Sequence, residues 1–168
     1  MHDVKALVAS ESVLAEVTSR FSSVALCPLV QGFVLLPLTD SVVRDLAAAR
    51  TSTELEHPKV DDMAPGVAGL AKELSRAGPV AYISTEFFGG AGGQEAVVWD
   101  GGRVTLLLSD GTEGGIAWPN SPVSRALRTI GVSAEEGKDE FDTVGLGTHR
   151  STNAWAAAQT ANTDNVLA

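Results

Sequence analysis

The chain has 168 residues, of which 44% are hydrophobic and 20% are charged, and its formal net charge is −9. This length suffices for one domain with its own apolar core, and the composition is typical of a folded protein rather than a disordered one. Because only twelve residues are Lys or Arg, the acidic balance argues against a nucleic-acid binder. We therefore expect a single domain over 1–168.

No segment of the sequence has the character of a membrane span or an export signal. The longest apolar stretch, FVLLPL at 33–38, is far too short to cross a bilayer, and MHDVKALVAS lacks a basic start followed by an apolar region. The single cysteine, Cys27, lies in the apolar run VALCPLV, which is typical of a buried, unreactive thiol in a reducing compartment. We expect a cytoplasmic protein without membrane contact. A catalytic thiol would need His57 or His149 beside it in space.

Apolar residues recur at helical spacing in four segments, 10–21, 39–50, 64–79 and 120–131. The last is the clearest, because Ser121 can cap a helix, Pro122 suits its first position and Gly131 can end it. The first two segments also begin at residues that cap helices, Ser10 or Ser12 and Thr39 or Asp40.

Strand-forming residues gather in the stretches between the helices, GFVLLPLT, PVAYISTEFF, QEAVVW and RVTLLLS. Pro37 places the first of these strands at a sheet edge or ends it. DGG at 100–102 predicts a tight hairpin between the last two, and the glycine-rich 89–93 joins the two before it. With IAW at 116–118 as a further candidate, the sequence predicts an α+β domain. Its sheet would be an antiparallel meander of three to five strands with helices packed on one face, followed by a loosely attached tail over 158–168.

The stretch EFFGGAGGQEAVVW at 86–99 could suggest a phosphate-binding loop. Such a loop runs from a strand into a helix, so that backbone N–H groups and the positive end of the helix converge on the anion. This one leads into another strand and lacks both the Lys-Ser/Thr ending of the P-loop and the GxGxxG spacing. We interpret it as a hairpin, with an anion-holding nest as the alternative, and we expect no cofactor.

Glu86 and Glu95 flank this hairpin, and paired carboxylates can divide acid and base roles. The strand register decides whether they meet. If Phe88 pairs with Gln94, the two glutamates point to opposite faces, and a slip by one residue would set them side by side. In any register Tyr82 and Glu86 share a face with Ser84, because side chains alternate along a strand.

His149 and Arg150 lie in GLGTHRSTNAW, between two glycines and a short predicted helix. The structural interpretation is a turn, with Trp155 packed into the core. The functional one makes His149 a general base or Arg150 an anion clamp. We expect no metal site, because the three histidines are scattered and no HExxH, CxxC or EF-hand spacing occurs. The GxSxG motif of serine hydrolases is also missing from the sequence, which weakens the hypothesis that the protein is an enzyme.

GFVLLPLTD, EFFGGAGGQEAVVW, SPVSRALRTIGV and DEFDTVGLGTHRSTNAW together resemble a family of uncharacterised bacterial proteins. The resemblance covers about 24–156 and implies no particular chemistry. In size, acidity and lack of catalytic motifs the chain is also similar to immunity proteins that neutralise bacterial toxins.

Two functional hypotheses follow. The first is an acidic interaction protein, immunity-like or inhibitor-like, that covers a basic protein partner. Its predicted contacts are Glu86, Gly90, Ala91, Gly92, Glu95, Glu135, Glu136, Asp139 and Glu140. The second is an enzyme or small-ligand binder with a site beside the hairpin, formed by Tyr82, Glu86, His149 and Arg150. Exposed strand edges would in addition permit a homodimer by sheet extension.

Overall fold

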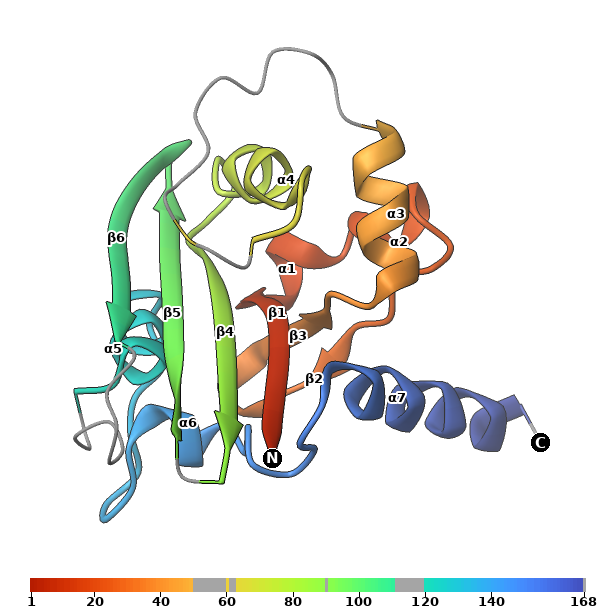
Figure 1. Ribbon diagram of the computed structural model, residues 1–168. Coiled ribbons are helices and arrows are strands. Elements are labelled where there is room, and N and C mark those ends of the chain that lie inside the picture. The colour runs from red at the N-terminus through yellow and green to blue at the C-terminus, as the bar shows by residue number, and fades with distance from the viewer. Residues whose placement is uncertain (50–59, 61–62, 90, 111–119, 168) are drawn as a thin grey trace.

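The computed structural model of the protein describes residues 1–49, 60, 63–89, 91–110 and 120–167 (Figure 1). In this part of the chain, one antiparallel sheet has six strands in the order β2-β3-β1-β4-β5-β6. The strands are β1 (His2–Ser10), β2 (Cys27–Pro28), β3 (Phe33–Pro37), β4 (Val80–Phe88), β5 (Ala91–Asp100) and β6 (Arg103–Asp110). The α+β class is confirmed, but the sheet exceeds the predicted three to five strands.

Neither β1 nor the two-residue β2 was predicted from the sequence. β1 lies in the interior of the sheet. It pairs with β3 on one side and with β4 on the other. Val4, Ala6 and Val8 face one core, while Leu7 and Ala9 face the other, and all five are buried. A strand buried on both faces has a continuous apolar run instead of an alternating pattern, so ALVA carried no clear strand signal. The helix predicted over 10–21 is two short helices, α1 (Glu11–Leu14) and α2 (Val17–Arg20).

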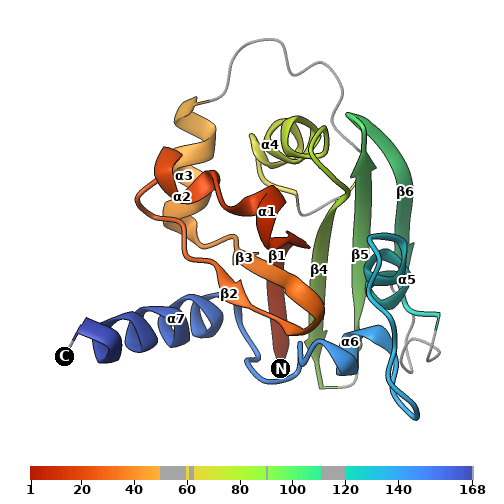
Figure 2. The same cartoon turned by 180° about the vertical axis from the view of Figure 1, so that it is seen from behind.

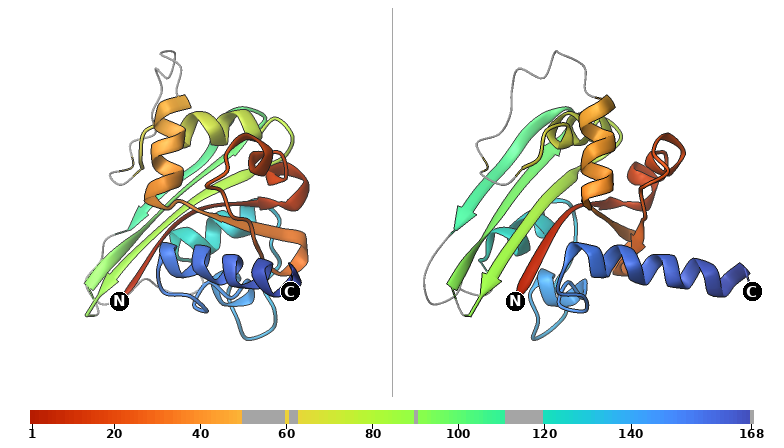
Figure 3. Two further views of the ribbon diagram at one scale, coloured as in Figure 1. Left: turned by 90° about the vertical axis from the view of Figure 1, so that its right-hand side faces the viewer. Right: turned by 45° about the vertical axis from the view of Figure 1, so that its right-hand side comes forward.

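Helices cover both faces of the sheet, so the prediction of one covered face was wrong (Figures 2 and 3). One face carries α1 and α2 with α3 (Asp40–Ala49) and α4 (Val67–Leu74). The other carries α5 (Pro122–Thr129), α6 (Glu140–Thr143) and α7 (Thr152–Leu167). We call these the α4 face and the α5 face. Interior strands with apolar residues on both sides need a cover on each, which explains the two layers of helices.

Local signals determined the ends of several elements as predicted. The Ser121 hydroxyl caps α5 by accepting from the Ser124 N–H at 3.3 Å, and Pro122 is the first residue of that helix. Gly131 follows it at a φ of 110°, a value that favours glycine. The Thr39 hydroxyl accepts from the Val42 N–H at 3.3 Å at the start of α3. Pro37 ends β3.

Both predicted hairpins are present. Asp100 pairs with Arg103, and the two glycines between them have φ values of 59° and 79°, as a tight turn with left-handed residues requires. Phe88 pairs with Ala91, so the β4–β5 loop is only residues 89–90, and Ala91 to Gly93 belong to β5. The strand predicted at 116–118 lies outside the described residues.

The segment predicted to be a loosely attached tail is instead the C-terminal part of a helix. Residues 158–167 are part of α7, which projects from the body of the molecule (Figure 3). Trp155, near the start of α7, is buried in the core of the α5 face, whereas 161–166 are exposed. In the described part of the chain, no helix is long and apolar enough to cross a membrane.

Candidate functional site

The α4 face of the sheet is open near the β4–β5 hairpin. Helix α4 covers the other end of β4, where Val80 and Tyr82 are buried. Towards the hairpin the same face forms a shallow pocket of about 510 Å³. We call this surface the hairpin-end face and define it by six residues of its lining, Ser84, Glu86, Phe88, Gly93, Glu95 and Ser109.

The observed register brings Glu86 and Glu95 to one face. Ser84 pairs with Glu95 and Glu86 pairs with Gly93, so the two glutamates are diagonal neighbours on adjacent strands. Neither register considered from the sequence occurs, because Phe88 pairs with Ala91 instead of Gln94. The predicted row of Tyr82, Ser84 and Glu86 does share this face, but Tyr82 is only 1% exposed and Ser84 only 3%.

Glu86 and Glu95 line the pocket on the α4 face, and Asp3 of β1, which pairs with the exposed Glu86, lies beside it. Asp110 of β6 also borders the pocket, but it pairs with Gln94, whose side chain bonds to α5, so Asp110 belongs to the other side of the sheet. The Ser109 hydroxyl donates to Glu95 Oε1 at 3.5 Å. Lys5 of β1, opposite Ser84, adds one positive charge to this face. Within the described ranges, no three His, Cys, Asp or Glu side chains converge as a metal site would require.

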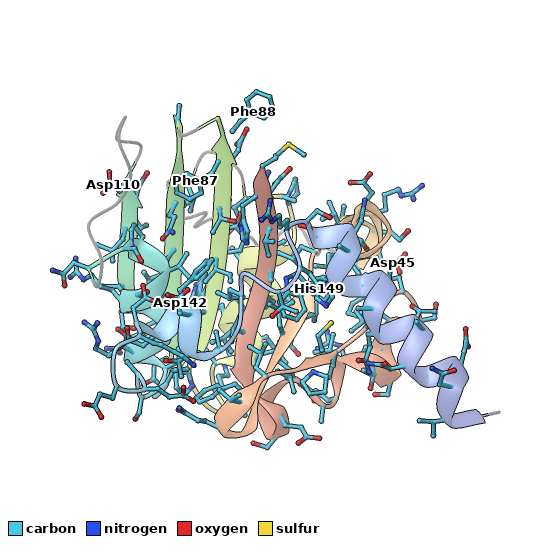
Figure 4. The ribbon with its side chains drawn as sticks, turned by 90° about the horizontal axis from the view of Figure 1, so that it is seen from below. Asp45, Phe87, Phe88, Asp110, Asp142 and His149 are labelled. Atoms are coloured by element: carbon cyan, nitrogen blue, oxygen red, sulfur yellow. The ribbon has the colours of Figure 1, made fainter. Side chains whose placement is uncertain are left out.

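Exposed apolar side chains lie at the hairpin end and along the edge strand β6. Phe88 at the hairpin end is 74% exposed, and Val104 and Leu107 of the edge strand β6 are 48% and 42% exposed. Val104 pairs with Trp99 and Leu107 pairs with Val97, so both point to the α4 face. Figure 4 shows Phe88 at the outer end of the hairpin, away from the body of the protein. Phe88 and Leu107 therefore place apolar surface near Glu86 and Glu95, whereas Val104 lies towards the opposite end of the sheet.

The sequence predicted three partner contacts at the hairpin tip, Gly90, Ala91 and Gly92. In the structure Ala91 is exposed, and Gly92 is half-buried within β5. Gly90 lies outside the described residues.

The acidic segment over 135–142 does not extend this surface. Glu135 and Glu136 are exposed, but Asp139 and Glu140 are buried, so the last two were wrong as partner contacts. This segment joins α6, which packs against α5, and it therefore lies on the α5 face.

Asp139 and Glu140 instead hold α5 and α6 together. Asp139 Oδ1 caps α6 by accepting from the Asp142 N–H at 2.8 Å, and its Oδ2 accepts from the Ser124 hydroxyl at 2.9 Å. Glu140 accepts two bonds from the Arg128 guanidinium, at 2.7 and 3.1 Å. This side-chain hydrogen bond raises the pKa of Arg128 above its ordinary value. The sequence alone did not distinguish these structural roles from surface exposure, because an acidic residue that caps a helix and one that faces solvent occur in the same kind of sequence.

The structure separates the four residues of the predicted catalytic site. Tyr82 and Glu86 lie on the α4 face, whereas the His149 ring stands against Trp155, in the core of the α5 face, with ring centroids 4.7 Å apart. Arg150 borders a different hollow with Met1, His2 and Phe87, and its carbonyl accepts from the Asp3 N–H at 2.8 Å. The geometry gives Glu86 no contact with His149 or Arg150.

His149 lines a second pocket, of about 390 Å³, beside α7. Cys27 of β2 also lines it, so the cysteine and a histidine do share a pocket, which no spacing in the sequence indicated. The Cys27 thiol donates to the Trp155 carbonyl at 3.4 Å, and burial raises its pKa to about 11. Because a thiolate and not a thiol is the nucleophile, this cysteine is unreactive at neutral pH.

The raised pKa of Cys27 predicts a loss of stability at alkaline pH. Folding favours the protonated thiol, so this contribution is complete below the ordinary pKa of 9.0 and is lost as the pH rises towards 11. The rise in pKa corresponds to at most about 3 kcal/mol in the free energy of unfolding. Urea unfolding at about pH 8 and about pH 11 measures it. The decline should be steeper for the native chain than for Cys27→Ala, and equal declines would contradict the prediction.

Comparisons with known proteins show no family for this chain. No family model matches it, and no solved structure matches it. It is similar to the "Probable cell wall protein PGA61" of Candida albicans, with 35% identity over 77 residues. The matched stretch is 45% of this chain and 34% of that protein, so the chain spans about a third of the relative's length.

Proposed function

We propose that this chain is a small interaction protein, of the inhibitor or immunity type, that binds a basic protein partner through the hairpin-end face. The observation that supports this most is the uncovered sheet surface on which Glu86 and Glu95 line a shallow pocket, with Asp3 paired to Glu86 on the neighbouring strand. The chain as a whole carries a net charge of −9, so its field attracts cations in the same sense as this face.

The two kinds of side chain on this face would have different roles in binding. Exposed carboxylates accelerate encounter with a positive surface and select against acidic partners, and salt weakens both effects. Phe88 would supply the apolar contact, because large aromatic side chains at the centre of an interface carry much of its binding energy. Its 74% exposure leaves most of the ring available to a partner.

The chemistry of the pocket favours binding over catalysis beside the hairpin. The described residues that line it include no His, Cys, Lys or Arg. The base and the anion clamp that the enzymatic alternative requires, His149 and Arg150, border other hollows.

Charge reversal on matched surfaces tests the proposal. Lysates of the native cells are passed over the immobilised native chain, over Glu86→Lys with Glu95→Lys, and over Glu135→Lys with Glu136→Lys. Both double variants change the net charge equally, but the second pair lies on the α5 face. We expect a stoichiometric basic protein on the native chain and on the second variant, lost from the first and weakened by salt.

Retention of that protein by the Glu86 and Glu95 variant would overturn the assignment of the face. Equal loss from both variants would show that overall charge, and not this face, holds the partner. Circular dichroism of each variant checks that the fold is kept. Phe88→Ala, which leaves all charges in place, should weaken the same complex by about tenfold or more.

We further propose that the protein acts in the cytoplasm, since Cys27 is a free buried thiol. The partial similarity to a protein named for the cell wall offers a different location to test. Fractionation of the native cells with an antibody to this chain distinguishes the two, and recovery in the wall fraction would contradict a cytoplasmic site.

A further inference from the structure

The pocket beside α7 is a second candidate site, independent of the hairpin-end face. It is bounded by β2, by the segment that carries Val144 and His149, and by one side of α7. Its walls come from the α5 face, whereas the proposed partner surface belongs to the α4 face. Its volume of about 390 Å³ lies in the range of small-molecule sites.

The lining of this pocket is polar in part but carries no Asp, Glu, Lys or Arg among the described residues. Cys27 and Trp155 form a buried, largely apolar floor. Thr148, His149, Gln159 and Asn162 supply polar groups around it. Burial of an ionic group without a charged partner is strongly unfavourable, so these residues suit a neutral ligand. The hairpin-end face, lined by Glu86 and Glu95, has the opposite character.

The observation that points to a ligand in this pocket is the indole N–H group of Trp155. Its side chain is 6% exposed, and its indole Nε1 is buried with no hydrogen-bond acceptor in the described part of the chain. A buried N–H group without an acceptor is destabilising, and native proteins rarely leave one unsatisfied without a reason. The His149 ring meets the Trp155 ring edge to face, and His149 is itself only partly buried.

We propose that this pocket binds a neutral small molecule with an apolar ring and a carbonyl or amide oxygen. The ring packs against the floor formed by Cys27 and Trp155, and the oxygen accepts from Trp155 Nε1. Since this nitrogen is covered in the free protein, the His149 ring shifts as the ligand enters. The side-chain amides of Gln159 and Asn162, three residues apart on α7, bond to the polar end of the molecule.

Three probes with one ring and different polar groups test this site: benzamide, benzoate and toluene. The readout is the indole N–H resonance of Trp155 in a ¹H–¹⁵N correlation spectrum of the full chain, assigned with Trp155→Phe. We expect benzamide to shift this resonance saturably, and benzoate to bind at least about tenfold more weakly because no Lys or Arg lines the pocket to offset the cost of burying its charge. Toluene should leave the resonance without the downfield shift that a hydrogen bond produces.

Matched variants locate the binding. Ala158→Phe places a ring in the pocket, whereas Ala157→Phe adds the same ring to the exposed side of α7. Val30→Phe narrows the pocket from β2's side at a residue that is 42% exposed, so it should not disturb folding. We expect Ala158→Phe and Val30→Phe to weaken benzamide binding at least about tenfold and Ala157→Phe to leave it unchanged. An unmoved Trp155 resonance, or benzoate binding as well as benzamide, would overturn the proposal, and neither result bears on the hairpin-end face.

Discussion

Gly92→Ala is expected to destabilise the protein by roughly 3 kcal/mol or more, because both its backbone and its surroundings exclude a side chain. Gly92 has a φ of 151°, a conformation that residues with a Cβ rarely adopt. A Cβ added there would overlap the Glu86 carbonyl oxygen and lie 2.8 Å from Phe87 Cα. Both of these are backbone atoms of the neighbouring strand, so β4 and β5 would have to separate. Chemical unfolding followed by circular dichroism measures the loss.

Two other glycines separate the causes of this effect. Gly89 has a φ of 60° but open space around its Cβ position, so Gly89→Ala should show only the backbone strain, about 1 kcal/mol. At Gly147 no atom lies within 4 Å of an added Cβ, and Gly147→Ala should change stability by less than about 0.5 kcal/mol. If Gly92→Ala proved as mild as Gly147→Ala, the observed pairing of Gly92 with Phe87 would be wrong.

Leu7→Ala should cost roughly 2 to 5 kcal/mol, since it removes a fully buried side chain from an interior strand. Leu7 is 0% exposed and lies in the core of the α4 face together with Leu36 and Tyr82 from the two strands that flank β1. The cavity left by the missing atoms would be enclosed by three strands and could not easily collapse. The midpoint of urea unfolding provides the measurement.

Leu107→Ala is the matched control, because it makes the same substitution at the sheet edge. Leu107 is 42% exposed, so its loss should cost less than about 1 kcal/mol. Equal effects at the two leucines would contradict the interior position of β1. Leu107 also lies beside the hairpin-end face, and its substitution therefore offers a mild probe of partner binding.

Several elements were predictable because their signals are local. The cap and the proline at Ser121 and Pro122 mark the start of α5 through bonds within one turn of helix. The Asp100 turn and the glycine hairpin were predicted from the φ values that only a few residue types tolerate. Strands β4, β5 and β6 follow one another along the chain, so their pairing required only short connections.

The candidate sites were predicted less well, because each depends on contacts between distant segments. Residues 1 and 150 are far apart in the sequence, yet Arg150 and Met1 border the same hollow. Cys27 and His149 come together only because β2 and α7 pack on the same face. Glu86 and Glu95 share a face as a result of a hairpin loop of two residues instead of five, and such a difference shifts the whole register.

The sequence by itself determined the α+β class, the hairpins, the capped helices and the acidic character of the surface, since these follow from backbone preferences and composition. Only the tertiary structure decided that β1 lies inside the sheet, that helices cover both faces, and which acids remain exposed. A residue such as Glu140 is buried because Arg128, on a neighbouring helix, neutralises it. Burial of this kind depends on the packing of separate elements, and no pattern within either segment specifies it.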